Sequence, residues 1–246
     1  MECIGIIPAR YQSTRFPGKP LVDIKGKSMI RRTWEQAKKA LDNVVIATDD
    51  DRIVKAVEGF GGNVLMTSHD HHSGTERCAE AVAAITAATG KEYDVVINIQ
   101  GDEPFIDPLQ IRLLADSFNK HRAGIATLVK KIDLAGDIFN PNLPKVVFSN
   151  EGYALYFSRS PIPYVRGHQQ KEWFDTHCFY RHIGMYAYRT GVLMEITGLE
   201  PSSLEIAESL EQNRWLENGY SIKVLETSLD TISVDTPEDL EKINNT

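Results

Sequence analysis

The feature that most constrains the fold is an alternation of short apolar runs with longer amphipathic segments through the first half of the chain. Turn-forming or charged residues bound each apolar run, which is typical of strands buried on both faces of a sheet. Because helical segments separate these runs, the pattern predicts an α/β fold with a mostly parallel, doubly wound sheet. The predicted strands cover residues 3–7, 44–48, 63–66, 95–100 and 125–129.

Residues with strong capping preferences delimit the helices between these strands. Ser28, Asp51 and Asp107 each precede a helical segment, and a short polar side chain there can accept hydrogen bonds from free N–H groups of the first turn. Glycines follow two of the segments, as expected where the backbone turns left-handed at a helix end. The predicted helices run from 29 to about 41, from 52 to 60, from Ser73 or Thr75 to about 89, and from 107 to 119.

The second half of the chain has a different pattern. It predicts a β-hairpin, then an aromatic-rich stretch, a helix, two further strands and a last helix. No linker or low-complexity segment divides the chain, so we expect one domain over residues 1–246 with an inserted β-rich lobe at about 146–190. The hairpin covers 146–149 and 153–158, the helix 204–218 before Gly219, the strands 222–225 and 232–234, and the last helix begins after 235–237.

Composition excludes several classes of protein. The formal net charge of −7 argues against a nucleic-acid partner, because such proteins usually carry a basic excess. No apolar run is long enough to span a membrane, and the amino terminus enters an apolar strand without a basic leader. We therefore expect a cytoplasmic protein with no membrane partner.

The cysteines predict reduced thiols. Cys3, Cys78 and Cys178 are far apart in sequence and form no C-x-x-C pair, which does not suggest a disulfide framework. A zinc site built from Cys78 and the histidines at 69, 71 and 72 is an alternative, but its spacing matches no standard zinc pattern. We favour the interpretation that these histidines lie in an exposed loop and bind no metal.

The segment from Ile6 to Leu21 predicts a phosphate-binding loop. An apolar strand opens into a loop that carries Arg10, Arg15 and Lys19 beside small residues. Arginine forms strong charge-assisted hydrogen bonds to phosphate, and backbone N–H groups of a small-residue loop add an anion site. The segment lacks the glycine spacing of a Walker A loop and of a dinucleotide fingerprint. A solvated surface turn is the alternative.

Two aspartates follow predicted strands and are candidate ligands of a metal ion. Asp102 comes after the strand at 95–100 and Gly101, where glycine lets the backbone approach a ligand. Asp235 follows the short strand at 232–234. Mg²⁺ prefers hard oxygen ligands and usually takes one or two carboxylates, with phosphate and water completing its shell. The alternatives are that Asp235 only caps the last helix and that Asp102 only holds a turn.

Seven sequence motifs, in order along nearly the whole chain, resemble those of the 3-deoxy-manno-octulosonate (KDO) cytidylyltransferases. They are IIPARYQSTRFPGKPL at 6–21, SGTER at 73–77, QGDEP at 100–104, ALYFSR at 154–159, RHIGMYAYR at 181–189, LEIAESLEQ at 204–212 and VDTPEDL at 234–240. The resemblance implies a nucleotide-diphospho-sugar transferase-like fold and conversion of CTP and KDO to CMP-KDO and pyrophosphate for lipopolysaccharide biosynthesis. It also implies Mg²⁺ dependence and a homodimer, with the β-rich lobe serving sugar binding and dimerisation.

The resemblance also implies roles for individual residues, in three groups. For CTP these are Pro8, Ala9, Arg10, Ser13, Thr14, Arg15, Lys19, Ser73, Gly74, Arg77 and Gln100. For the sugar acid they are Gln100, Arg159, His182, Tyr186, Glu208 and Gln212. The catalytic group is Arg10, Lys19, Asp102 and Asp235, of which the two aspartates bind the metal. If 204–218 is one helix, Glu205, Glu208 and Gln212 share a face that can accept hydrogen bonds from a polyol.

Other interpretations of the same residues stay open. Each glutamate on the helix at 204–218 can instead lie on a solvated face, and His182 and Tyr186 can be ordinary core residues of an apolar strand. The stretch 164–180 is the least constrained by the resemblance and is a candidate to line the sugar pocket. A sialic acid or an amino-substituted octulosonate is therefore an alternative substrate. A non-catalytic CTP sensor is the alternative from another functional class.

Overall fold

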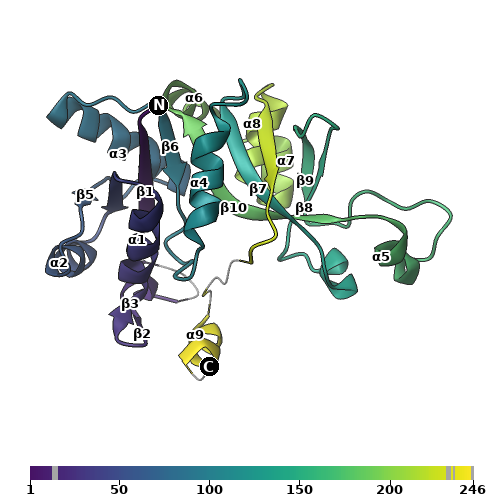
Figure 1. Ribbon diagram of the computed structural model, residues 1–246, viewed down its shortest axis with the longest axis horizontal. Helices are drawn as coiled ribbons and strands as arrows, with labels where there is room; N and C mark the ends of the chain where they lie inside the picture. The colour runs from purple at the N-terminus through teal and green to yellow at the C-terminus, as the bar shows by residue number, and fades with distance from the viewer. Residues whose placement is uncertain (13–15, 231–233, 235, 245–246) are drawn as a thin grey trace.

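The computed structural model describes residues 1–12, 16–230, 234 and 236–244, with the side chains of Lys242 and Asn244 left out. Within these residues the centre of the molecule is a nine-stranded sheet in the order β11-β7-β10-β6-β1-β4-β5, which β8 and β9 extend from β10 (Figure 1). The prediction of a mostly parallel α/β sheet is confirmed, because β6, β1, β4 and β5 run parallel, as do β7 and β11.

The strands are close to those that the sequence predicts. They are β1 (Cys3–Ala9), β4 (Val44–Thr48), β5 (Val64–Met66), β6 (Val95–Asn98), β7 (Ile125–Lys131), β8 (Lys145–Phe148), β9 (Ala154–Ser158), β10 (Tyr180–Arg189) and β11 (Ile222–Glu226). A separate two-stranded hairpin, β2 (Asp23–Ile24) with β3 (Lys27–Ser28), was not predicted. The predicted strand at 232–234 lies largely outside the described residues.

Helices cover both faces of the sheet. One face packs on α1 (Met29–Ala40), α2 (Asp51–Gly59) and α4 (Pro108–Ser117). The other packs on α3 (Gly74–Thr89), α6 (Thr190–Ile196) and α8 (Glu211–Glu217). The remaining helices are α5 (Trp173–Thr176), α7 (Ser203–Glu208), α9 (Pro237–Asn244) and the 3₁₀ turns η1 (Lys19–Leu21), η2 (Ala135–Phe139) and η3 (Gln170–Glu172).

Side-chain alternation along the central strands explains why the sheet needs both layers. In β1, Ile4 and Ile6 join the core beneath α3, whereas Ile7 joins the core beneath α1, and all three are fully buried. Because successive residues of a strand point to opposite faces, a continuous apolar run must be covered on both sides. This packing is what makes the first half of the sequence so informative about the fold.

The strand β10 was predicted only as an apolar strand, and its central place in the sheet was not foreseen. It pairs antiparallel with β6, with Tyr186 opposite Asn98, and antiparallel with β7, with Ala187 opposite Ala126. It also pairs with β8, which in turn pairs with β9. The second half of the chain is therefore hydrogen-bonded into the middle of the sheet.

One predicted helix, over residues 204–218, is wrong as a continuous element. It is divided into α7 and α8 at Ser209, whose φ of 50° and ψ of 49° are left-handed. Contacts with Arg159, the residue that follows β9, account for the break. Arg159 Nε donates to the carbonyl of Glu208 at 2.6 Å and Arg159 Nη2 to that of Ser209 at 3.2 Å, so these carbonyls are used outside the helix.

Smaller differences occur at helix starts. Asp50, not Asp51, caps α2, and its side chain accepts a hydrogen bond from the N–H of Arg52 at 2.9 Å. Ser28 precedes α1 but makes no capping hydrogen bond with its side chain. The glycine predicted to end the helix at 218 is confirmed as left-handed, because Gly219 has a φ of 83°.

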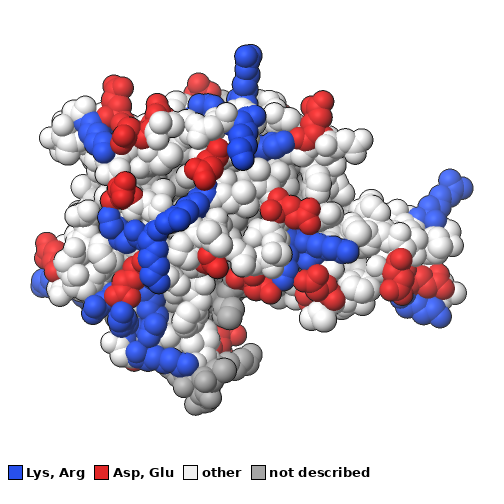
Figure 2. Space-filling view, viewed as in Figure 1, with Lys and Arg blue, Asp and Glu red and all other residues white. Residues whose placement is uncertain are grey.

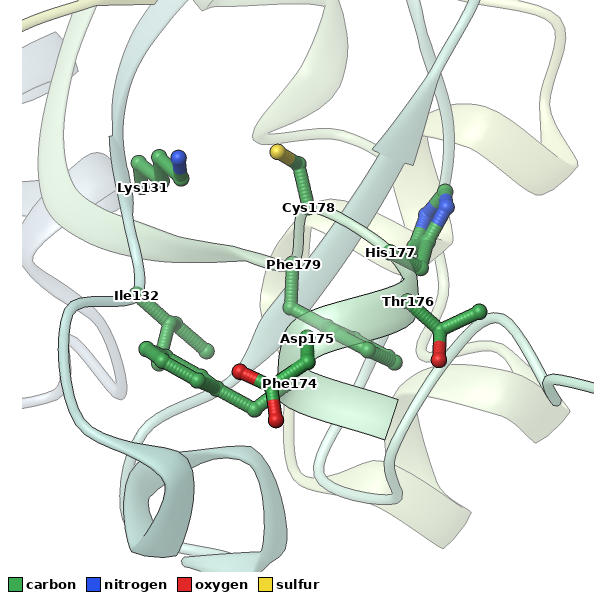
Figure 3. A pocket seen from close by; sticks show the side chains of 8 residues that line it. All are labelled: Lys131, Ile132, Phe174, Asp175, Thr176, His177, Cys178 and Phe179. Atoms are coloured by element: carbon green, nitrogen blue, oxygen red, sulfur yellow. The ribbon is translucent and has the colours of Figure 1, made fainter. Parts of the chain in front are cut away.

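Residues 160–179 form an arm that extends beyond β8 and β9 and ends near α5 (Figure 1). The arm has a small core in which Trp173 and Phe179 pack with Ile132 and Ile138. Between α5 and the end of β7 lies a pocket of about 220 Å³, whose lining side chains, including Lys131 and Cys178, are shown in Figure 3. In the stretch proposed to line the sugar pocket, Trp173 and Phe179 are therefore buried in this small core, whereas most of the other residues are exposed.

Charged side chains of both signs are interspersed over the face shown in Figure 2, where Lys and Arg gather around α1 and the β2–β3 hairpin. Part of this basic patch is neutralised, because Lys27 and Arg31 both pair with Glu35 at 2.7 and 3.0 Å. In the part of the chain that is described, no helix combines the length and the apolar character needed to cross a bilayer.

The close approach of β1 to the loop after β6 yields a stability prediction. A Cβ atom at Gly101 would lie 2.8 Å from the carbonyl oxygen of Pro8, so Gly101→Ala must displace backbone. We expect a loss of about 1–3 kcal/mol in the free energy of unfolding, measured by urea denaturation. Gly136→Ala is the control, because a Cβ at Gly136 has no atom within 4 Å. Equal stability of the two variants would contradict this view of the strand ends.

Candidate active site

The carboxyl ends of three adjacent parallel strands form the floor of the candidate site. In β1, Ala9 pairs with Thr48 of β4, and Ile6 pairs with Asn98 of β6. The loops that follow these strands therefore leave the same edge of the sheet, which is where ligands of doubly wound folds bind. The residues delivered there include Arg10, Asp49, Gln100 and Asp102.

An ion pair joins two of the predicted catalytic residues. Lys19 Nζ lies 2.8 Å from Asp102 Oδ2, and the Lys19 side chain is 12% exposed while that of Asp102 is 34% exposed. The carbonyl of Asp102 also accepts a hydrogen bond from the N–H of Val234 at 3.0 Å. The phosphate loop, the end of β6 and the segment before α9 thus meet at Asp102.

The loop between β1 and η1 closes on itself through Tyr11 and Gly18. The N–H of Gly18 donates to the carbonyl of Tyr11 at 2.8 Å, and Gly18 has a φ of 73°, a left-handed conformation that favours glycine. The guanidinium of Arg52 stacks on the Tyr11 ring at 3.3 Å, and Arg10 Nη2 donates to the carbonyl of His71. Three predicted nucleotide-binding residues, Ser13, Thr14 and Arg15, lie outside the described residues.

The amino-terminal end of α3 lies beside this loop. Ser73 caps α3 in a reciprocal arrangement with Glu76, in which each side chain accepts a hydrogen bond from the other's backbone N–H. A Cβ at Gly74 would lie 3.4 Å from both Pro8 and Asn98, so the first turn of α3 packs closely on the strand ends. The free N–H groups and the dipole of a helix N-terminus favour anions. Ser73 and Gly74 are therefore brought to the predicted phosphate loop.

Arg77 lies beneath this edge and is fully buried. Its Nη1 donates to Thr67 Oγ1 at 2.5 Å and its Nη2 to Asp49 Oδ2 at 2.7 Å. These contacts connect α3 with the ends of β4 and β5. The structure thus shows Arg77 as a support of the strand ends, and its predicted role in CTP binding stays a prediction.

Gln100 links the end of β6 to β10. It follows β6 directly, and its Nε2 donates to the carbonyl of Gly184 in β10 at 3.0 Å. Gly184 falls within the irregular part of the β10–β7 ladder, where the register shifts between Ile183 and Tyr186. The predicted role of Gln100 toward both nucleotide and sugar stays a prediction.

Two of the predicted sugar-binding residues, Arg159 and Glu208, contact each other. Glu208 Oε1 accepts hydrogen bonds from Ser158 Oγ at 2.6 Å and Tyr156 Oη at 3.2 Å, and its Oε2 accepts one from the N–H of Arg159 at 2.9 Å. Burial raises the pKa of Glu208, but these hydrogen bonds outweigh burial and leave the pKa below its usual value. The Glu208 carboxylate therefore stays charged and holds α7 against β9.

The other predicted sugar-binding residues belong to a buried cluster on β10 and α8. His182 Nε2 is hydrogen-bonded to Thr127 Oγ1 at 2.9 Å, and the His182 ring lies 5.2 Å from that of Tyr186. Gln212 is 4% exposed, so the predicted face shared by Glu205, Glu208 and Gln212 is wrong. The break at Ser209 turns Glu208 to β9, while Gln212 points into the core.

Comparison with known proteins decides the family. The family model described as cytidylyltransferase matches residues 4–227. A 3-deoxy-manno-octulosonate cytidylyltransferase of Parabacteroides distasonis is 58% identical over 98% of this chain and 96% of its own length. The chain belongs to the KDO cytidylyltransferase family. A second relative with the same name, from Cytophaga hutchinsonii, is 52% identical over 100% of this chain and 98% of its own length.

Solved structures support the same family and fold. A CMP:2-keto-3-deoxy-manno-octonic acid synthetase complexed with CTP is 41% identical and superposes with a TM-score of 0.90, covering 100% of this chain and 98% of that one. A putative glucose-1-phosphate thymidylyltransferase of Bacillus anthracis, 18% identical with a TM-score of 0.63 over 99% of this chain and 94% of that one, shows the fold alone. The predicted family and fold of this cytidylyltransferase are thus confirmed.

The donor set of the cytidylyltransferase suits an ion that takes few protein ligands. Among the described side chains no group of three or more His, Cys, Asp or Glu is placed to hold a metal. Asp102, a partly exposed carboxylate at a strand end, is the predicted ligand within this part of the chain. The other predicted ligand, Asp235, lies outside the described residues. Mg²⁺ fits such a site, because phosphate and water supply most of its ligands.

Two acidic residues of the site were missed in the sequence. Asp49 follows β4 and pairs with Arg77, and the rule that singled out Asp102, an aspartate directly after a buried strand, applies to it equally. Glu211 begins α8 and accepts a hydrogen bond from Thr75 Oγ1 at 2.7 Å. No sequence pattern indicates this second contact, because it joins residues 136 positions apart.

Burial of His182 predicts a pH dependence of stability. Burial lowers the pKa of His182 from 6.5 to about 3, so the unfolded chain binds a proton at His182 at a higher pH than the folded chain does. This contribution to stability is fully present above pH 6.5 and is lost progressively as the pH falls toward 3. When the pH falls from 7 to 5, the free energy of unfolding of His182→Gln should decrease by about 2 kcal/mol less than that of the wild type. Urea denaturation at each pH measures the difference.

The exposed His168 provides the control for this measurement, because 46% of its side chain is accessible. His168→Gln should follow the wild-type pH dependence. If His182→Gln also followed it, His182 would not be the group that couples folding to protons in this range.

Proposed function

We propose that this chain is a 3-deoxy-manno-octulosonate cytidylyltransferase that converts CTP and KDO to CMP-KDO and pyrophosphate for lipopolysaccharide biosynthesis. The observation that carries the proposal is the match, over the whole chain at 41% identity, to a synthetase solved with CTP. The geometry is compatible with this reaction, because the strand ends gather a cationic loop, a helix N-terminus and a carboxylate at one edge of the sheet.

We assign binding of the triphosphate to the loop after β1 and to the first turn of α3. Arg10 and Lys19 supply positive charge that stabilises the β- and γ-phosphates as they depart as pyrophosphate. The N–H groups at the start of α3, around Gly74, add donors for phosphate oxygens. Lys19 is held at the site by Asp102, which orients its ammonium group before the substrate binds.

We assign binding of the sugar acid to β9, β10, α7 and α8. Arg159 carries the positive charge for the carboxylate of the sugar acid, and its guanidinium is oriented by the carbonyls of Pro141, Glu208 and Ser209. We assign Gln100 to the junction at which the anomeric hydroxyl approaches the α-phosphorus, and its hydrogen bond to Gly184, which links the end of β6 to β10, supports this assignment. In a single displacement, the bond from this hydroxyl oxygen to the α-phosphorus forms, the bond to pyrophosphate breaks and the hydroxyl proton passes to solvent, so no protein nucleophile is needed.

Mg²⁺ is part of the proposal, with Asp102 and Asp235 as its ligands. When bound, the ion neutralises phosphate charge and lowers the pKa of the attacking hydroxyl. Val234, which directly precedes Asp235 in the chain, donates its N–H to the carbonyl of Asp102, and this contact supports pairing the two aspartates.

A panel of substrates tests the function. Pyrophosphate release should require CTP together with KDO. UTP, ATP and GTP are tested in place of CTP, and a sialic acid in place of KDO. Mass spectrometry of the product should find CMP-KDO. A site that hydrogen-bonds one base edge leaves polar groups unpaired with the wrong base, which favours CTP by a large factor. Turnover with a sialic acid instead of KDO would overturn the sugar assignment. Binding of CTP without any turnover would identify a sensor.

The same assay tests Asp102. Asp102→Asn removes one ligand charge and should lower the rate at saturating Mg²⁺ by at least ~10²-fold. Asp116→Asn, on the exposed face of α4, is the control and should retain wild-type turnover. Near-wild-type turnover of Asp102→Asn would contradict its assignment to the metal.

We also propose a cytoplasmic homodimer formed through the arm and the start of η2. The three cysteines are free, which agrees with a reducing compartment. Tyr164 is 73% exposed and Leu134 67% exposed, and the Tyr164 ring packs 5.2 Å from that of Trp173. Large apolar patches at the surface are typical of protein interfaces, and we propose that these two side chains belong to one such patch.

Sedimentation of the purified chain tests this dimer. The wild type should sediment as a dimer, and the double variant Tyr164→Ser, Leu134→Ser should shift toward the monomer. Leu109→Ser is the control, because Leu109 is 59% exposed on α4 in another part of the molecule. A dimer unaffected by the double variant would place the interface elsewhere.

A further inference from the structure

A chain of polar contacts joins the first turn of α3 to helices α8 and α7. Thr75 Oγ1 donates a hydrogen bond to Glu211 Oε2 at 2.7 Å, and Arg214 Nη2 donates one to Glu211 Oε1 at 3.1 Å. Arg214 Nε lies 3.2 Å from Glu205 Oε2, in the first turn of α7. Glu211 is the member of this chain that contacts the nucleotide side of the site.

The Glu211 side chain is 25% exposed, but the residues that it contacts are buried. Thr75 is 2% exposed and Arg214 6% exposed. The Trp215 ring, on the same helix, packs 5.0 Å from Tyr186 and 5.7 Å from Tyr188. Burial raises the pKa of Glu211. Hydrogen bonds in such surroundings are stronger than in water, so the contact between Glu211 and Thr75 holds the two helices in a defined arrangement.

The two ends of this contact lie next to residues proposed for different substrates. Thr75 immediately follows Ser73 and Gly74, in the turn proposed to bind the nucleotide. Glu211 immediately precedes Gln212, which is proposed for the sugar acid. In-line attack requires the hydroxyl and the α-phosphorus to be placed accurately, and an error of about 1 Å can cost roughly 10²-fold in rate.

We propose that Glu211 is a positioning residue for the transfer reaction, because its carboxylate links the first turn of α3 to the first turn of α8 and thereby aligns the two substrates. The inference rests on the proposed cytidylyl transfer. Glu211 acts through Thr75 and the two helices and does not touch the reacting atoms. Loss of the link should therefore lower kcat, while each substrate still binds its own half of the site and its KM changes little.

Substitutions at both ends of the hydrogen bond test the proposal. Thr75→Val removes the hydroxyl with little change in volume and should lower kcat about tenfold, with less than about threefold change in the KM of either substrate. Thr75→Ser restores a hydroxyl and should remain within about twofold of wild-type kcat. Glu211→Gln should also lower kcat, and combining it with Thr75→Val should lower kcat no further than the worse single variant.

The control variant is Glu217→Gln at the other end of α8, where Glu217 accepts a hydrogen bond from Ser203 Oγ at 3.2 Å, and its kcat should equal that of the wild type. Thermal unfolding of every variant separates misfolding from misalignment, and Glu211→Gln serves if Thr75→Val does not fold. Wild-type kcat in folded Thr75→Val, or multiplicative effects in the double variant, would overturn the positioning role alone. Absence of wild-type turnover with CTP and KDO would overturn both this role and the proposed function.

Discussion

The antiparallel pairing of β10 with β6 and β7 is the contact on which the rest of the structure depends. It brings a strand from residues 180–189 into the middle of a sheet whose other central strands come from the first half of the chain. Through this pairing Gln100 reaches Gly184, and His182 and Tyr186 come to lie beside β6 and β7. Without it, the predicted phosphate-binding loop and the predicted sugar-binding residues would not be held at the same edge of one sheet.

Close approach of backbone at the strand ends is the second requirement of the site. Gly101 has no room for a side chain against the carbonyl of Pro8, and Gly74 packs on Pro8 and Asn98. The ion pair of Lys19 and Asp102 adds little to stability, since partly exposed pairs contribute about 0–1 kcal/mol. Its main effect is to place a cation and an anion beside each other where the proposed substrate charge accumulates.

The second half of the site is organised by hydrogen bonds that interrupt regular structure. Arg159 donates hydrogen bonds to the carbonyls of Glu208 and Ser209, which therefore take no part in helical pairing. The Glu208 carboxylate accepts a hydrogen bond from Ser158 of β9. The resulting break allows α7 and α8 to contact different elements, so that Glu208 faces β9 while Glu211 faces Thr75. On one continuous helix, the carboxylates of Glu208 and Glu211 would have a fixed spacing and orientation and could not make both contacts.

The sequence alone determined the layered α/β architecture, because apolar runs buried on both faces need helices on each side of the sheet. It also singled out Asp102, because polar residues that follow buried strands collect at one edge of the sheet, and Lys19, because it lies in a cationic loop of small residues. Only the tertiary structure decided the central place of β10, the break at Ser209, the burial of Arg77 and the contact of Glu211 with Thr75. Local patterns record which residues a helix or strand buries, whereas these features arise from contacts between residues far apart in the chain, which no local periodicity encodes.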